Sequence, residues 1–591
     1  MPSSLSLTPV VELEGQKLAE KWLSALVELR VERQYQVPTR VTMRFSDFGY
    51  ELLSSPTLRL GHAVKVSQHG GADLAEAEIT SIGAEQRPGD NPEIVVVALD
   101  KSHRLGRATQ VKVYKASTYS DIVSKMAQDA GLTPSVDSTT LQLEYLMQAE
   151  SDLVLLTELA RRTGFDWWME GSKLHFAKPA KKGDVTLTLG DTLLSFSARV
   201  SGVTPSEVKV DGWDRTKQES VSSSASSADV PKASSDLADL LDSPPAPFGS
   251  ATVFSAGLGV QSSAEAEALA KSVYNRAVTS AVTAKGVAYA DAAITLGATA
   301  VIKGAGPLSG SYPITEVEHV FRPASGFVTR FVSGERRPTT LVDTLGGLVA
   351  APAGAYTGPA HLRTGVTVGV VTNNNDPSHS GRVKVRFPGL SQNMESDWAR
   401  VVSVGGGAKR GSVWIPEIDD EVLVAFEGGD ARQPVVIGGL YGQKSTMPVA
   451  KVENSEVQTR AMTSRLGHVI SFLDGTTPAT EAVEIVLAGE KHKIHLGKDK
   501  LAVTVPSGTP VEVTAGNTSL KFSNSGDITL EATNITIKAT NELKLQAAQA
   551  SVQAQATLDI KANAKLGVSG GILEMQSNGP AKLAGTPVMI N

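Results

Sequence analysis

Residues 528–575 read ITLEATNITIKATNELKLQAAQASVQAQATLDIKANAKLGVSGGILEM, and this stretch decides the fold. Its apolar residues come in pairs separated by one residue, which is the side-chain period of a β-strand. The pairs start 7, 8, 7, 8, 8 and 7 residues apart, and mostly polar residues typical of turns lie between them. The pairs are Ile528/Leu530, Ile535/Ile537, Leu543/Leu545, Ala550/Val552, Leu558/Ile560, Leu566/Val568 and Leu573/Met575.

A strand of this length buries too little apolar surface to be stable alone, but stacked strands bury a continuous core. A period of about seven and a half residues supplies one strand and one turn, which is too short for one chain to enclose a core. The pattern therefore predicts a β-helix shared by several chains, most simply three. The predicted trimer core of this needle consists of Ile528, Leu530, Ile535, Ile537, Leu543, Leu545, Val552, Leu558, Ile560, Leu566 and Val568.

The chain before the repeat divides into regions of different pattern. Residues 1–215 alternate strand and helix patterns, with helices expected at 120–130 and 152–162, and form the first part of an N-terminal domain. Residues 216–250 are rich in Ser, Ala and Pro and predict a linker or insertion. Residues 251–345, with a helix at 263–280, form the second part of that domain, and residues 346–364 predict an interdomain linker.

Residues 365–442 predict a small closed barrel such as an OB-fold. Five or six short strands with Gly and Pro turns fall in this segment, and it has no helical pattern. The expected strands are 366–371, 381–387, 399–404, 411–415, 421–426 and 434–437. Residues 443–591 follow as a neck and the needle.

Composition narrows the class of protein. The chain of 591 residues has room for several domains, and its formal net charge of −6 gives no general field for binding polyanions. It has no cysteine, which excludes disulfides, cysteine nucleophiles and cysteine-ligated zinc. No apolar run approaches the roughly 20 residues that cross a bilayer, and the first residues lack the pattern of a signal peptide. We therefore expect synthesis and folding in the cytoplasm, and export, if any, by a route other than general secretion.

Short motifs occur in a definite order over about 300 residues. They resemble the central spike proteins of contractile injection systems, namely the VgrG proteins of type VI secretion and the spikes of phage-tail-like extracellular particles. One position departs from the family pattern: Asp419 stands where the family usually has Gly, which predicts a slightly altered turn. The motifs lie at 152–167 (with Arg161-Arg162-Thr163-Gly164-Phe165), 209–214, 310–321, 369–371, 381–385, 397–400, 420–426 and 433–441.

The resemblance implies a mainly β fold with three parts. These are a hub of β-barrel-like subdomains with a few helices, an OB-fold collar, and an intertwined trimeric β-helix as needle. It implies a homotrimeric spike at the tip of an injection system, where it links a sixfold inner tube and baseplate to a needle that breaches a target envelope and helps deliver effectors. Such a protein is part of a particle that reaches the extracellular space or a target cell on release or firing.

The resemblance also implies partners. These are an inner-tube (Hcp-like) hexamer, baseplate proteins, effectors and a small cap of the PAAR type, with no nucleic acid. The apolar residues at the end of the sequence are the expected contact for the cap, because exposed apolar groups mark interaction surfaces. These residues are Val588, Met589 and Ile590, and the expected contact also includes the polar Asn591.

We expect no catalytic, cofactor or metal site. His492 and His495 lie three residues apart, so in a strand they face opposite sides and make a poor metal pair. Residues 419–421 are interpreted as a charged turn, and residues 405–409 as a mobile hairpin because they lack the spacing of a phosphate-binding loop. Four collar aromatics lie in apolar strand patterns with few flanking cations, which favours core packing over base stacking. They are Phe387, Trp398, Trp414 and Phe426.

Two classes of function remain open. The first is a structural puncturing protein. The alternative is a spike-associated or β-helical carbohydrate-active enzyme. The segment between Tyr441 and Ile470 is too short for a catalytic domain, so the first is favoured. The target cell, the cargo, the anchoring of the particle and the role of residues 216–250 do not follow from the sequence.

Overall fold

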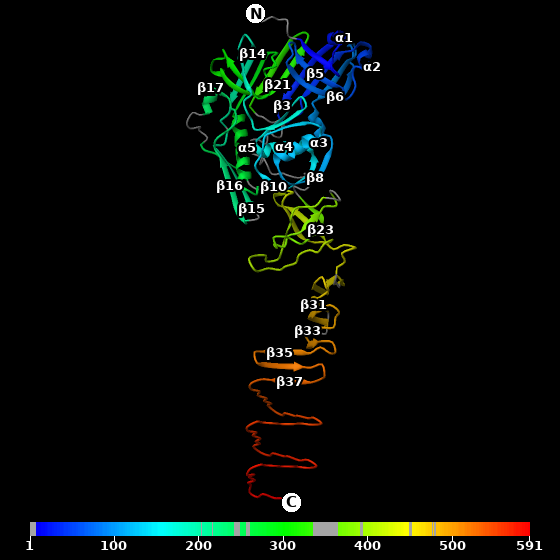
Figure 1. Ribbon diagram of the computed structural model, residues 1–591, viewed down its shortest axis with the longest axis vertical. Coiled ribbons are helices and arrows are strands. Elements are labelled where there is room, and N and C mark those ends of the chain that lie inside the picture. The colour runs from blue at the N-terminus through cyan, green and yellow to red at the C-terminus, as the bar shows by residue number, and fades with distance from the viewer. Residues whose placement is uncertain are drawn as a thin grey trace. The chain divides into compact units, whose positions relative to one another are not determined.

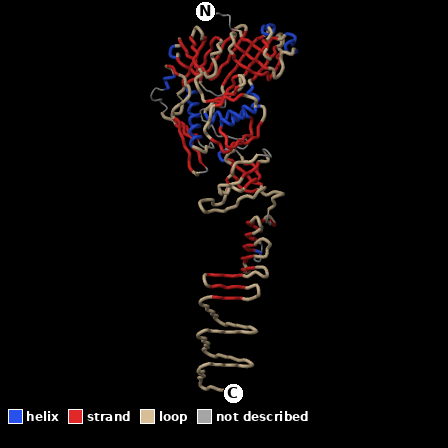
Figure 2. Tube along the Cα trace, viewed as in Figure 1, coloured by secondary structure: helices blue, strands red, loops and turns tan. Residues whose placement is uncertain are grey.

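The computed structural model describes residues 8–202, 204–214, 217–241, 249–255, 260–334, 365–389, 394–447, 452–475, 477 and 480–590. The predicted linker 346–364 and Asn591 lie outside the described residues. The protein consists of two compact units, residues 1–447 and 448–591. It is mainly β, as the sequence predicts (Figures 1 and 2). Among the described residues, no helix is long and apolar enough to span a membrane.

The first unit is organised by one fourteen-stranded sheet with the strand order β14-β19-β22-β21-β3-β4-β7-β6-β5-β1-β2, to which β13, β17 and β20 are attached (Figure 1). Its first half contains β1 (Pro9–Leu13), β2 (Gln16–Lys17), β3 (Leu26–Gln34), β4 (Arg40–Ser46), β5 (Ala63–Gln68), β6 (Asp73–Glu85) and β7 (Glu93–Leu99). Its second half contains β13 (Gly183–Thr188), β14 (Leu193–Val200), β17 (Ser234–Ser235), β19 (Val282–Tyr289), β20 (Ala298–Lys303), β21 (Gly310–Arg322) and β22 (Gly326–Ser333).

The two halves of this sheet carry separate apolar cores. Leu29, Met43 and Phe45 belong to the first core, and Tyr312 and Phe331 belong to the second. The halves meet where β3 and β21 pair antiparallel. Two barrel-like subdomains are therefore present, as expected for the hub, and they share one continuous hydrogen-bonded sheet although β3 and β21 lie almost 300 residues apart in the sequence.

Salt bridges reinforce this central strand pair. Glu28 accepts hydrogen bonds from Arg30 and, at 2.6 Å, from Arg322 Nε. Glu318 pairs with Arg30 and with Arg330, the latter at 2.9 Å. Each carboxylate thus lies between two guanidinium groups, which holds the pKa of Glu28 below its usual range despite partial burial.

A smaller layer of helices and short sheets packs beneath the large sheet, where α3, α4 and α5 lie together (Figure 1). Its helices are α3 (Tyr119–Asp129), α4 (Asp152–Thr163) and α5 (Ser263–Ala281). Its strands are β8 (Thr109–Thr118), β9 (Thr133–Val136), β10 (Gln142–Ser151), β11 (Asp166–Glu170), β12 (Lys173–Ala177), β15 (Glu207–Asp214), β16 (Glu219–Ala225) and β18 (Thr252–Ser255). Short helices α1 (Glu20–Ser24), α2 (Glu51–Ser54), η1 (Phe48–Tyr50), η2 (Lys101–Gly106), η3 (Ala238–Leu241) and η4 (Gly306–Leu308) complete the hub.

Local signals explain where these helices begin and end. Thr118 caps α3: its hydroxyl accepts from Asp121 N at 3.1 Å, and the Asp121 carboxylate accepts from Thr118 N at 2.9 Å. Helix α3 therefore begins one residue before the predicted range 120–130. Helix α4 ends at Gly164, whose φ of 73° is in the left-handed region that terminates many helices.

The described part of 216–250, predicted as a linker or insertion, contains the strand β16. Strand β16 pairs antiparallel with β15 along its whole length, and Val221 and Ala225 enter a small core against α5. Asp229 binds Lys178 at 2.8 Å. The Ser-rich sequence gives little strand signal. Two apolar residues on one face are enough to pack the strand, and serines occupy most of its other positions.

The collar is a five-stranded sheet with the order β24-β23-β26-β27-β25. Its elements are β23 (Val366–Asn373), β24 (Lys384–Arg386), β25 (Arg400–Val401), β26 (Glu421–Phe426), η6 (Glu427–Gly429) and β27 (Pro434–Gly439). Tyr145 and Met147 of β10 pack into the same core as Val422 and Val424, which ties the collar to the hub. The predicted strand at 411–415 is absent: these residues belong to a long hairpin loop with exposed side chains.

The second unit contains two antiparallel sheets and a long segment without strands. A small hairpin, β28 (Val452–Glu453) and β29 (Glu456–Val457), precedes them. The neck sheet contains β30 (Thr459–Thr463), β31 (Val469–Asp474), β32 (Glu481–Val486), β33 (Lys493–Gly497) and β34 (Leu501–Thr504), and the next sheet contains β35 (Val511–Ala515), β36 (Thr518–Phe522) and β37 (Ile528–Glu531). After β37 the described chain has no strand, and Figure 2 shows it continuing as loops.

Candidate functional site

The neck sheet exposes one apolar face. Cross-strand pairing places Met462, Ile470, Ile485, Ile494 and Val503 in one row over five strands. A second row on the same face runs through Phe472, Val483, Leu496 and Leu501. All nine side chains, which we call the neck face, are more than a third exposed in the single chain. An apolar face of this extent marks an interaction surface.

The opposite side of the neck sheet carries a cluster of charged and polar side chains. His495 Nδ1 lies 2.7 Å from Glu484 Oε1, and Lys493 Nζ lies 2.5 Å from the same atom. Burial disfavours the Glu484 carboxylate, but these two partners outweigh it and hold its pKa below the usual range. His495 thus lies within hydrogen-bond distance of Glu484. The described residues contain no group of three or more His, Cys, Asp or Glu side chains suited to hold a metal.

The predicted needle core is not brought together within one chain. The eleven residues predicted for it, from Ile528 to Val568, are between 48% and 85% exposed. The described backbone of 532–590 makes no backbone–backbone hydrogen bond within the chain. Backbone amides and carbonyls in folded proteins almost always find partners, so both the apolar side chains and the backbone of this segment are left for other groups to satisfy.

The residues predicted for the cap contact are exposed as well. Val588 is 47%, Met589 83% and Ile590 88% exposed. They form a short apolar group that is available for contact.

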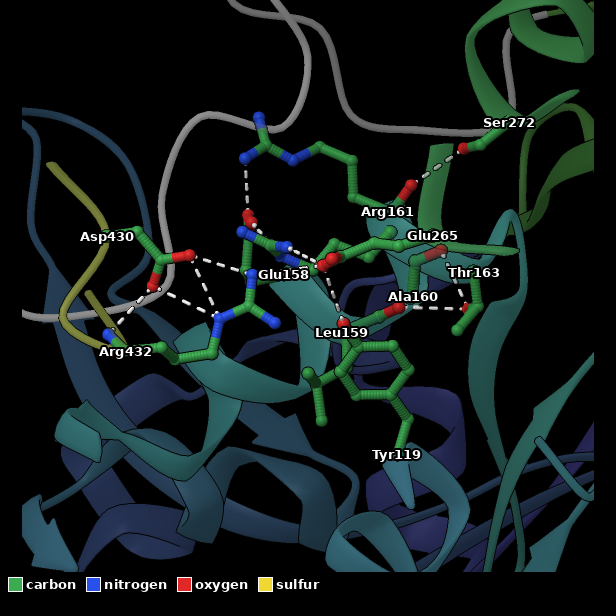
Figure 3. Close-up of polar contacts among 11 residues, drawn as sticks. Tyr119, Glu158, Leu159, Ala160, Arg161, Thr163, Glu265, Ser272, Asp430 and Arg432 are labelled. Carbon is green, nitrogen blue, oxygen red and sulfur yellow. Dashed lines mark hydrogen bonds and ion pairs between the residues drawn. The ribbon is translucent and has the colours of Figure 1, made fainter. Parts of the chain in front are cut away.

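A cluster of buried charges joins the hub to the collar, and sequence reasoning missed it (Figure 3). Glu265 Oε1, at the start of α5, accepts from Arg162 Nη1 of α4 at 2.9 Å and from Arg432 Nη2 of the collar at 3.0 Å. Asp430 Oδ2 accepts from Arg432 Nη2 at 2.7 Å. All four side chains are at most 5% exposed.

The neighbours of this cluster show its electrostatic balance. Burial, helped by Glu265, raises the pKa of Tyr119 to about 12. Burial alone disfavours the charge of Arg432, but Asp430 and Glu265 outweigh it and raise the pKa of this guanidinium well above its ordinary value. Arg162 lies inside the motif at 152–167, and Arg432 directly precedes the motif at 433–441. Nothing in the sequence pairs either arginine with Glu265.

The collar aromatics divide into two groups. Phe387 and Phe426 pack in the core with ring centroids 5.7 Å apart, as predicted. The core prediction is wrong for Trp414, which is 60% exposed because it lies on the hairpin loop rather than on a strand. Trp398 is half-buried with Lys384 Nζ 5.3 Å and the Arg382 guanidinium 5.9 Å from its ring, so flanking cations are present where few were expected.

The two turns singled out in the sequence are ordinary connections. Asp419 adopts a φ of 71°, so it takes the left-handed conformation that a Gly would supply, and the predicted alteration of the turn is not needed. Asp420 closes that charged turn by accepting from Glu417 N at 2.8 Å. The segment 405–409 is the tip of a hairpin in which Gly407 and Arg410 exchange backbone hydrogen bonds.

The collar matches a known domain family. Residues 367–441 match the type VI secretion system/phage-baseplate injector OB domain, within the collar predicted at 365–442. Residues 78–322 match a model described as the Alg8 N-terminal domain. The structure of an E. coli type VI secretion component described as similar to T4 bacteriophage tail proteins superposes with a TM-score of 0.46 at 16% identity, covering 73% of this chain and 99% of that one.

Two curated relatives are type VI secretion system spike proteins. VgrG3 of Vibrio cholerae is 40% identical over 74 residues, and VgrG5 of Pseudomonas aeruginosa is 38% identical over 96 residues. These matches cover 12% and 16% of this chain but only 7% and 12% of the relatives' own lengths. The injector OB domain and the spike relatives confirm the resemblance drawn from the motifs: the chain is similar to the VgrG-type central spike proteins of contractile injection systems.

Proposed function

We propose that three copies of this chain form the central spike of a contractile injection system, with residues 528–590 as a shared puncturing needle. The observation that carries the proposal is the segment 532–590, whose backbone makes no backbone hydrogen bond within the chain and whose apolar pairs are exposed. Three intertwined copies satisfy both needs at once, because neighbouring chains supply strand partners while the apolar pairs meet at the centre. The neck face gives each copy a second surface to bury against the others.

The hub is proposed to dock on a sixfold inner tube and its baseplate. Each chain contributes two barrel-like subdomains on one sheet. Three chains would then present six similar units, which solves the mismatch between a trimer and a sixfold partner. The spike works as part of an injection particle, where it transmits contraction to a target envelope and carries effectors.

A PAAR-type cap is proposed to bind at Val588, Met589 and Ile590, with Asn591 beside them. The support is the exposure and apolar character of Val588, Met589 and Ile590. Deleting residues 587–591 should abolish capture of a purified PAAR-type protein and leave the number of chains unchanged. Undiminished capture by the truncated spike would refute this contact.

The enzyme alternative is not favoured. The matched curated relatives are named spike proteins, and the injector OB domain belongs to the same kind of assembly.

Light scattering of the purified full-length chain tests the proposed function. We expect a particle of three times the chain mass of 62.0 kDa. A folded particle of single-chain mass in dilute buffer would overturn the shared needle.

A further inference from the structure

The collar carries an exposed apolar arm. Residues 402–418, the collar arm, leave the barrel after β25 and return before β26. Val404 and Val413 are 85% and 79% exposed, and Trp414 is 60% exposed. Val402, Ile415 and Ile418 are also among the exposed large apolar side chains. Apolar side chains at this density on a surface loop are a sign that another surface covers them.

The arm has a defined shape. Ser412 N donates to Val404 O at 3.0 Å, and Gly407 and Arg410 close the hairpin tip. At the base, Val402 N donates to Val436 O at 2.9 Å, and Asn374 Nδ2 donates to Pro416 O at 3.2 Å. Because the hairpin and its base are hydrogen-bonded, the arm presents its apolar side chains with less loss of conformational entropy on binding than an unstructured loop would incur.

The collar also carries a second apolar surface. On the outside of the barrel, cross-strand pairing aligns Val366 with Ala425 and Val435, and Val368 with Leu423 and Gly438. Val366 and Val368 are exposed, and Leu423, Ala425 and Val435 are partly exposed. We call these five side chains the collar face. The buried core lies on the other side of the same strands, at Val422, Val424 and Val436.

We propose that the collar arm of one copy packs on the collar face of the next copy, so that three arms close a ring of collars. This rests on the proposed trimer. Arm and face are different surfaces of one domain, so their contact is heterologous, and a heterologous contact forms a closed ring when its rotation matches the number of copies. Only 12 residues separate Gly439 at the end of β27 from Val452 at the start of β28, so copies joined at the neck keep their collars at a high local concentration.

Crosslinking through introduced thiols tests the contact, because the chain has no cysteine of its own. Two differently tagged full-length chains are co-expressed, one carrying Val413→Cys on the arm and the other Val368→Cys on the face. A bis-maleimide with a short spacer can then join these two thiols only between chains. We expect a crosslinked product that carries both tags, and no such product when Val413→Cys is paired with Leu60→Cys, an exposed hub position 67% accessible.

Trp414→Ser is a second test of the contact. This variant should fold normally, because the indole lies largely outside the core. Added to the arm-labelled chain, it should lower the yield of the doubly tagged product at least several-fold. If light scattering shows three chains but no arm–face product forms, the arm contact is overturned and the proposed spike stands. If the particle has single-chain mass, the proposed function itself fails, and the ring of collars fails with it.

Discussion

Glu265 and Arg432, 167 positions apart in the sequence, meet in a buried ion pair at 3.0 Å between the hub and the collar. Arg162 shares the same carboxylate oxygen at 2.9 Å. One carboxylate on α5 therefore compensates two buried guanidinium groups that come from different parts of the chain.

Replacing this carboxylate should destabilise the first unit strongly. Glu265→Gln leaves two arginines in a buried site with less negative charge, and breaking such a pair costs about 3–5 kcal/mol. Thermal unfolding of the full-length protein measures it. Glu267→Gln on the same helix is the control, because Glu267 pairs with Lys271 in an exposed i,i+4 contact worth less than about 1 kcal/mol. Equal unfolding temperatures for the two variants would contradict the structural role of the cluster.

If the neck face is buried in the trimer, substitutions at neighbouring positions of β34 should differ sharply in their effect on association. Val503→Asp places a charge on the apolar face in every copy, and Thr504→Asp places the same charge on the other side of β34, opposite Lys493. We expect Val503→Asp to weaken the trimer by about 3 kcal/mol or more and Thr504→Asp to be mild. Sedimentation across a dilution series measures the association, and similar curves for both variants would show that the face is not buried.

The needle should respond in the same way along its length. Ile537→Asp or Leu545→Asp puts three unpaired charges near one interior seam, whereas Lys538→Asp changes a position between the apolar pairs. The first two variants should lower the resistance of the trimer to denaturant sharply, and the third should not. Equal tolerance at all three positions would argue against inward-facing pairs.

His319 predicts a dependence of stability on pH. Burial first, and Arg33 second, lower its pKa to about 3, while in the unfolded chain it is near 6.5. The unfolded state therefore binds an extra proton between these values, so this contribution is complete above about pH 6.5 and is lost as the pH falls toward 3. At pH 5 the loss is about 2 kcal/mol. Denaturant titrations at pH 7 and pH 5 should show it, and His319→Gln should show a smaller difference between the two pH values.

Elements with local signals were predictable from the sequence. Helix α4 has Ser151 as its cap and Gly164 at its end, and β26 spans the same residues in the pattern and in the structure because its alternation matches a half-buried strand. The order of the motifs was enough to predict the β-rich hub and the OB-fold collar. The needle stays a prediction, drawn from the repeat at 528–575.

Other features depend on contacts that no local pattern encodes. Strand β16 forms because β15 offers a hydrogen-bonding edge, and its Ser-rich sequence carries almost no strand signal. Trp414 lies between Val413 and Ile415, and this apolar run predicted a buried strand. All three residues instead lie on the collar arm with exposed side chains. The pairing of Glu265 with Arg432 is set by the packing of distant elements.

In the proposed spike, the steps of assembly follow a fixed order, because the described backbone of residues 532–590 has no backbone hydrogen-bond partner within its own chain. The neck sheet closes its own hydrogen bonds within one chain, whereas the segment after β37 does not. In the proposed spike, three finished necks must therefore meet before the first rung can close, and each rung then positions the three chains for the next. Such zippering makes the first encounter the slow, concentration-dependent step. Once complete, the needle can unfold only from its ends. This geometry suits a part that must stay rigid under the load of a single contraction.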